Sequence, residues 1–157
     1  MARAVEQALE RWSIGPGDLC LCGGARGGDL LFAEACLRAN AHVLLLLALP
    51  MDEFIERSVR IPGTAWETRF RAVANKSIIL AVDQQAICAG TEKNPFARCN
   101  DCLITLSVAL AAPREPLALL VWDRKPSKPG KPGTGDFAEK AATASSSIVT
   151  IDPLNPK

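Results

Sequence analysis

Four glycines lie between Gly23 and Gly28, where a short apolar run meets an amphipathic run that begins at Asp29. This order predicts a strand, a tight turn and a helix. Glycine lets the backbone come close to a ligand, and the first N–H groups of the following helix face outward at its positive end without internal partners. The turn therefore predicts a binding site for a phosphate or a similar anion, to which Arg26 adds positive charge.

The spacing GGxxGGD matches neither G-x-G-x-x-G nor the lysine-bearing Walker pattern, so a glycine-rich turn needed only for close packing is the alternative interpretation. Asp29 also has two interpretations. Its carboxylate could cap the helix by accepting from the first amides, or it could orient a ribose or substrate hydroxyl. The ligand-binding residues assigned to the turn are Gly23, Gly24, Ala25, Arg26, Gly27, Gly28 and Asp29.

The composition of the 157 residues predicts one domain, residues 1–157, in the cytoplasm and without a membrane partner. The longest apolar run, residues 43–50, is too short to span a bilayer, and the first residues are typical of a helix rather than a secretory leader. The 18 basic and 17 acidic residues nearly balance, which argues against a broad nucleic-acid-binding face. We expect the six cysteines to be reduced, partly buried thiols rather than a disulfide framework.

Strands and helices are predicted to alternate along the whole chain. The expected strands are residues 19–22, 42–49, 77–82, 117–122 and 148–151, and the expected helices are residues 2–12, 29–39, 51–60, 64–75, 95–110 and 134–144. This pattern predicts an α/β fold, a Rossmann-like three-layer sandwich with a mostly parallel sheet of about five strands. The stretch 124–132, rich in proline and lysine, is expected to be an exposed, mobile loop.

Polar residues follow the expected strands at several places. Ligands of parallel sheets bind outside the carboxyl ends of the strands. The turn at 23–29, Asp83, the loop at Asn94, Asp123 and the turn at 133–134 all fall at such ends. Their convergence predicts one ligand site at this edge of the sheet.

Several motifs in order resemble those of the SLOG superfamily, the SMF/DprA-LOG Rossmann-like fold. They are GGARGGDLLFAEA, the helix with ERSV, WxxRF, NPFARCN, and LLVWD followed by GTGDF. The likeness is to domains found beside tetratricopeptide-repeat, TIR or nucleotide-cyclase regions in bacterial proteins, which implies signalling by nucleotide binding. By position it implies a phosphate-facing glycine turn, a pocket edge and a second ligand loop, the latter two formed by Asn94, Arg98, Asn100, Gly133, Thr134 and Asp136.

The chain departs from the family pattern at its beginning. SLOG domains start with a strand and a glycine- or serine-containing loop, whereas this chain starts at the first helix. The resemblance thus implies an N-terminally incomplete domain that lacks a central strand and half of the phosphate cradle. Relatives also carry an aromatic residue in place of Cys102, and Gly133-Thr134-Gly135 is only a near match to their last turn.

Binding or sensing of a nucleotide or nucleotide-derived small molecule is the leading hypothesis, with fused effector domains or a second copy of the chain as partners. The alternatives are a nucleotide-processing enzyme with phosphoribohydrolase-like N-glycosidic hydrolysis, or a degenerate fragment. The glutamate motif PGGxGTxxE is missing, Glu34 is interpreted as a solvated helical carboxylate, and His42 has no evident partner, so no catalytic residue is assigned. Only Cys99-x-x-Cys102 has zinc-knuckle spacing, so no metal or other cofactor is assigned.

Overall fold

The computed structural model describes residues 1–81, 94–125, 132–144 and 147–155. The helices are α1 (Ala2–Arg11), α2 (Gly28–Arg38), α3 (Met51–Phe54), the π-helix η1 (Ile55–Val59), α4 (Trp66–Ala74), α5 (Pro95–Ala111) and α6 (Thr134–Thr143). The strands are β1 (Leu19–Cys22), β2 (His42–Leu47), β3 (Ile78–Ala81), β4 (Leu117–Val121) and β5 (Ser147–Ile151). The α/β class predicted from the alternation of apolar patterns is confirmed.

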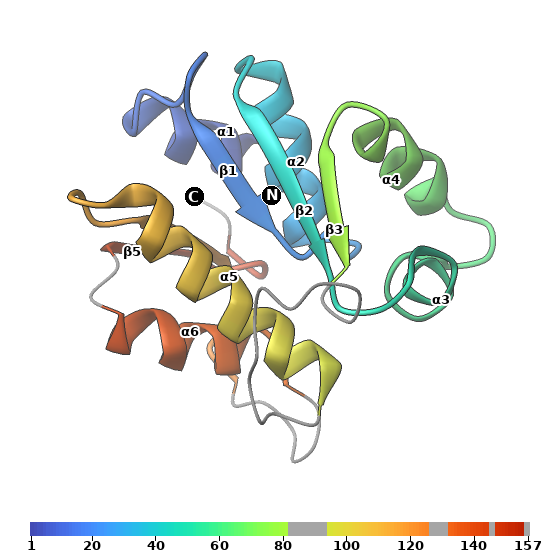
Figure 1. Cartoon of the computed structure of the whole chain (residues 1–157). Helices are drawn as coiled ribbons and strands as arrows, with labels where there is room; N and C mark the ends of the chain where they lie inside the picture. Colours follow the sequence, from blue (N-terminus) through green and yellow to red (C-terminus); the bar gives the residue numbers. More distant parts are fainter. Residues whose placement is uncertain (82–93, 126–131, 145–146, 156–157) are drawn as a thin grey trace.

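The strands form two parallel sheets, in the orders β1-β2-β3 and β4-β5 (Figure 1). Cys20 pairs with Val43 in the first sheet, and Val121 pairs with Ile151 in the second. The parallel direction agrees with the prediction. The single sheet of about five strands is not observed, because within the described residues no strand ladder joins the two sheets.

The continuous apolar run of β2 is the centre of the core. Its residues from Val43 to Leu47 are all buried, as expected for a strand that is covered on both faces. Figure 1 shows α2 behind the β1-β2-β3 sheet and α5 on its near side. Leu45 and Leu47 share this core with Leu30 of α2 and Phe70 of α4, and all four side chains are almost fully buried.

The helix starts agree with the sequence at α5 and differ at α2. The Asn94 side chain accepts from the backbone N–H groups of Phe96 and Ala97, and Pro95 occupies the first turn, which confirms the predicted start of α5. At α2, Gly27 is the N-cap residue with φ 94°, and no side chain caps the helix. The capping interpretation of Asp29 is therefore wrong, because glycine at positive φ begins the helix two residues earlier.

Three further expectations are corrected or lie outside the described residues. The segment expected as one helix over 51–60 divides into α3 and the π-helix η1. Cys20, Cys22, Cys36 and Cys99 are free and buried as expected, whereas Cys102 is disulfide-bonded. Asp83, the segment 84–93 before Asn94, and residues 126–131 of the expected mobile loop lie outside the described residues. Among the helices described here, none has the length and apolar character needed to cross a bilayer.

Candidate functional site

Two of the four glycines in the turn are packed against side chains. Gly24 is buried at φ 75°, and a Cβ atom there would lie 3.4 Å from the Phe70 ring and 3.5 Å from a Leu47 methyl group. A Cβ on Gly28 would lie 3.0 Å from the Cβ of Val121 in β4. At Gly28 the turn has glycine because β4 approaches its backbone closely, whereas at Gly24 the positive φ favours glycine and the contacts are ordinary.

The remaining glycines face Asp29 and open space. A Cβ on Gly23 would lie 3.0 Å from Oδ2 of Asp29, whereas a Cβ on Gly27 would meet no atom within 4 Å. Gly27 has φ 94°, a conformation that residues with a side chain rarely adopt. The turn is thus packed along most of its length and open at Gly27, immediately before α2.

The Asp29 carboxylate folds back into the turn. Its Oδ2 accepts from the Ala25 N–H at 3.1 Å, and burial raises the pKa of this half-buried side chain. The next amide, that of Arg26, donates to the carbonyl of Ser58 in η1 at 3.0 Å. These two amides therefore have partners within the chain, and so does that of Leu30, which donates to the Ala25 carbonyl. The donors left to an anion at the turn are the N–H groups of Gly28 and Asp29.

The second turn of α5 lies against the end of β2, near the glycine turn. Cys99 Sγ donates to the Leu46 carbonyl at 3.1 Å. Burial first, and then the nearby Asp29 carboxylate, raise the pKa of the Cys99 thiol to about 12. Cys99, which lies between the predicted residues Arg98 and Asn100, is thus close to the carboxylate of the glycine turn.

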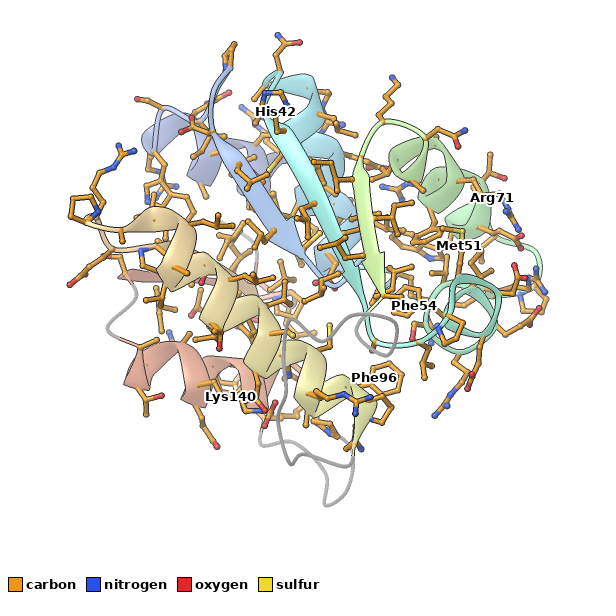
Figure 2. The ribbon with its side chains drawn as sticks, in the orientation of Figure 1. His42, Met51, Phe54, Arg71, Phe96 and Lys140 are labelled. Carbon is orange, nitrogen blue, oxygen red and sulfur yellow. The ribbon has the colours of Figure 1, made fainter. Side chains whose placement is uncertain are left out.

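Arg98, directly before Cys99, has a buried hydrogen-bond donor without an acceptor. Its Nε atom is buried and has no hydrogen-bond partner among the described residues, and the side chain as a whole is half-buried. Buried donors in folded proteins are almost always paired, so this atom is a candidate donor to a ligand. Phe96 lies two residues earlier at the start of α5 (Figure 2), with the Arg57 guanidinium 5.5 Å from its ring centre.

The predicted second ligand loop contacts α5 through polar side chains. Asn100 Nδ2 donates to Asp136 Oδ2 at 2.6 Å and to the Gly133 carbonyl at 3.4 Å. The structure thus joins the two groups of residues that the resemblance assigned separately. Thr134 is the first residue of α6, directly after Gly133.

Sequence reasoning missed two charged residues in this contact. Lys140 Nζ lies 2.8 Å from Asp101 and 3.1 Å from Asp136, and it donates to the Ala97 carbonyl. The i, i+4 spacing of Asp136 and Lys140 was the available signal. Because Asp136 is engaged by both Asn100 and Lys140, we interpret it as a residue that holds α6 against α5.

The described part of the chain has no cluster of three or more His, Cys, Asp or Glu side chains that could hold a metal ion. No family model, curated protein or solved structure matches the chain. We therefore base the functional conclusion on the chemistry of the residues at the carboxyl ends of β1 and β2.

Proposed function

We propose that the chain is a binding or sensing module for a nucleotide or nucleotide-derived small molecule, whose phosphate lies between the first turn of α2 and Arg98. The observation that carries the proposal is the buried Nε of Arg98, which has no acceptor among the residues that the structure describes. A buried donor without an acceptor costs roughly 1–3 kcal/mol. A phosphate oxygen would remove that cost and would form a charge-assisted hydrogen bond with the guanidinium.

The first turn of α2 supplies the other side of this site. The Gly28 and Asp29 amides are among the first N–H groups of the helix, which have no intrahelical acceptor and lie at the positive end of the helix dipole. Gly27 leaves open space beside them. The Asp29 carboxylate would repel a phosphate when ionised, but its raised pKa favours the neutral form. We therefore expect tighter binding as the pH falls toward the pKa of Asp29.

We also propose that the two sheets and their helices form a Rossmann-like arrangement, because this arrangement bears on where the ligand binds. A Rossmann-like three-layer arrangement, as in the SLOG superfamily, would place the ligand outside the carboxyl ends of parallel strands. β1 ends at Cys22, directly before the turn, and its parallel neighbour β2 ends at Leu47. Fused effector domains or a second copy of the chain would then respond to ligand binding.

A nucleotide-processing enzyme is the second candidate, and the environment of Asp29 is the observation that favours it. A half-buried carboxyl group with a raised pKa is suited to general acid or base chemistry, such as hydrolysis of an N-glycosidic bond. Asp29 would exchange a proton with the leaving base or with the attacking water. This candidate requires turnover, which the binding module does not.

Calorimetric titration with adenosine monophosphate, inorganic phosphate and adenosine tests the proposal. We expect the two phosphate-bearing probes to bind and adenosine to bind weakly. Arg98→Gln should weaken binding by about 10- to 100-fold, the loss of a hydrogen bond to a charged group. Arg114→Gln, which removes an exposed arginine after the end of α5, is the matched control and should bind as the unmodified chain does.

Chromatography of the same mixtures distinguishes the two candidate functions. Release of adenine would show that the chain hydrolyses the nucleotide, whereas binding without adenine release would support a binding or sensing module. Absence of phosphate-dependent binding, or equal affinity of the Arg98→Gln and unmodified chains, would overturn the proposed site.

A further inference from the structure

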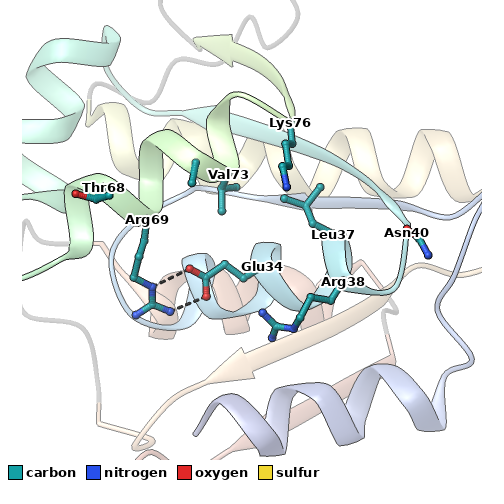
Figure 3. Close-up of a pocket in the computed structure, with 9 residues that line it drawn as sticks. Glu34, Leu37, Arg38, Asn40, Thr68, Arg69, Val73 and Lys76 are labelled. Atoms are coloured by element: carbon teal, nitrogen blue, oxygen red, sulfur yellow. Dashed lines mark hydrogen bonds and ion pairs between the residues drawn. The ribbon is translucent and has the colours of Figure 1, made fainter.

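A cavity lies away from the glycine turn. It is a groove of about 540 Å³ between the C-terminal half of α2 and α4 (Figure 3). Both helices end just before a strand begins, α2 before His42 and α4 before Ile78. The groove therefore lies toward the amino ends of β2 and β3, whereas the glycine turn follows the carboxyl end of β1. Its volume is within the range of roughly 300–1,000 Å³ found for small-molecule sites.

The acidic side chain of the groove is already neutralised. Glu34 accepts two hydrogen bonds from Arg69, at 2.7 and 2.6 Å, as the dashed lines in Figure 3 show. The Arg69 guanidinium also lies over the Trp66 ring, 4.4 Å from its centre. A bidentate pair that is stacked on an aromatic ring has a fixed geometry. Glu34 is therefore a poor attachment point for a cationic ligand.

Positive charge remains on the rim. Lys76 is exposed, and no ion pair of its ammonium group occurs among the residues that the structure describes. Arg38 pairs with Glu6 at 2.6 Å, but both side chains are largely exposed, at 54% and 40%, and such pairs are weak. Between these cations the groove is lined by apolar atoms of Leu37 and Val73. The groove thus combines an apolar surface with excess positive charge.

We propose that this groove binds a small organic anion with an apolar or aromatic body. The body would lie on Leu37 and Val73, and the anionic group would bind Lys76 and Arg38. This site is independent of the proposed nucleotide site, because it shares none of the residues assigned there.

Fluorescence titration with 8-anilinonaphthalene-1-sulfonate, an aromatic anion, tests the proposal on the full chain. We expect saturable binding, with amide chemical-shift changes in a ¹H–¹⁵N spectrum concentrated at residues 34–40 and 68–76. Lys76→Gln should weaken binding by about fivefold to tenfold, and adding Arg38→Gln should weaken it further. Leu37→Ala should also weaken binding, because it removes part of the apolar surface.

Two control variants separate this groove from other sites. Lys125→Gln removes an exposed lysine that pairs with Asp123, and it should leave the affinity unchanged. Arg114→Gln, which removes an exposed arginine after the end of α5, should also leave it unchanged. Shift changes outside the groove, equal affinity in the Lys76→Gln, Arg38→Gln double variant, or no saturation up to about 1 mM would overturn the proposal.

Discussion

Gly28, the first residue of α2, lies against Val121, the last residue of β4, so closely that a Cβ atom on the glycine would stand 3.0 Å from the valine Cβ. The two residues belong to different parts of the fold, because β4 pairs with β5 and α2 follows β1. Both atoms are fixed to the backbone and cannot rotate away. The glycine turn is thus a contact point between the two sheets as well as a candidate site.

Gly28→Ala should therefore destabilise the protein. Relief of the contact requires a backbone shift, and overpacking of this kind costs about 1–3 kcal/mol in the free energy of unfolding. Urea unfolding followed by circular dichroism measures the change. Gly133→Ala is the control, because a Cβ there meets no atom within 4 Å and its φ of −159° is extended. Equal effects of the two substitutions would contradict the close packing at Gly28.

Arg69→Lys should cost more stability than Arg71→Lys. Lysine cannot reproduce the two parallel hydrogen bonds to Glu34 or the stacking on Trp66, so we expect a loss of about 1 kcal/mol. Arg71 pairs with Glu67 on an exposed helix surface, and lysine there keeps the positive charge, so the loss should be smaller. Urea unfolding of both variants, with Glu34→Gln to complete a double-mutant cycle for the first pair, provides the measurement. A coupling energy near zero would show that the Glu34–Arg69 pair does not stabilise the fold.

Asp29 should make the protein less stable as the pH rises. Burial raises the pKa of this carboxyl group above its ordinary value of 3.8, so the folded chain holds the proton more tightly than the unfolded chain does. The free energy of unfolding therefore falls between the ordinary pKa and the raised folded pKa. Asp29→Asn should remove this fall, which unfolding curves at a series of pH values would detect.

Glu67 should show the opposite pH dependence and serves as the comparison. Hydrogen bonds from Arg60, and then from Arg71, lower its pKa from 4.5 to about 2. Its contribution to stability is complete above the ordinary pKa and is lost as the pH falls toward about 2. Glu67→Gln should therefore flatten the acid limb of the stability profile. If Asp29 and Glu67 changed the free energy of unfolding with pH in the same direction, the assigned environments would be contradicted.

Cys20 should be the first of the four free thiols in the described part of the chain to react with iodoacetamide. A hydrogen bond with the Cys36 side chain lowers the pKa of Cys20 and raises that of Cys36, while burial raises the pKa values of Cys22 and Cys99. The thiolate is the reactive form. Peptide mass spectrometry of a labelling time course at about pH 8 gives the order. Cys36→Ala should slow the labelling of Cys20, and labelling of Cys22 or Cys99 at the same rate as Cys20 would contradict the prediction.

Local sequence signals predicted those elements whose structure depends on local interactions. The apolar run of β2 and the Asn94–Pro95 start of α5 are examples, because each follows from side chains within a few residues. The π-helical turn at Ile55–Val59 was missed, since its composition does not differ from that of an α-helix. The division into two sheets was also missed, because strand pairing depends on distant residues.

The candidate site was predictable in position and not in detail. Strand, turn and helix order located residues 23–29, and the resemblance added the residues on α5 and α6. No pattern in the sequence could show that the Asp29 carboxylate turns back to Ala25, or that Arg98 Nε is buried with no acceptor in the described part of the chain. The Glu34–Arg69 pair joins two helices, so the interpretation of Glu34 as a solvated carboxylate is wrong.

The division of the strands also has a mechanical consequence. Among the described residues, no backbone hydrogen bond joins the β4-β5 pair to the β1-β2-β3 sheet. Separating the two costs apolar packing but breaks no ladder, so the smaller pair can open as a unit while the larger sheet persists. Amide protons in residues 117–121 and 147–151 should therefore exchange with solvent deuterium together, and earlier than those of β2.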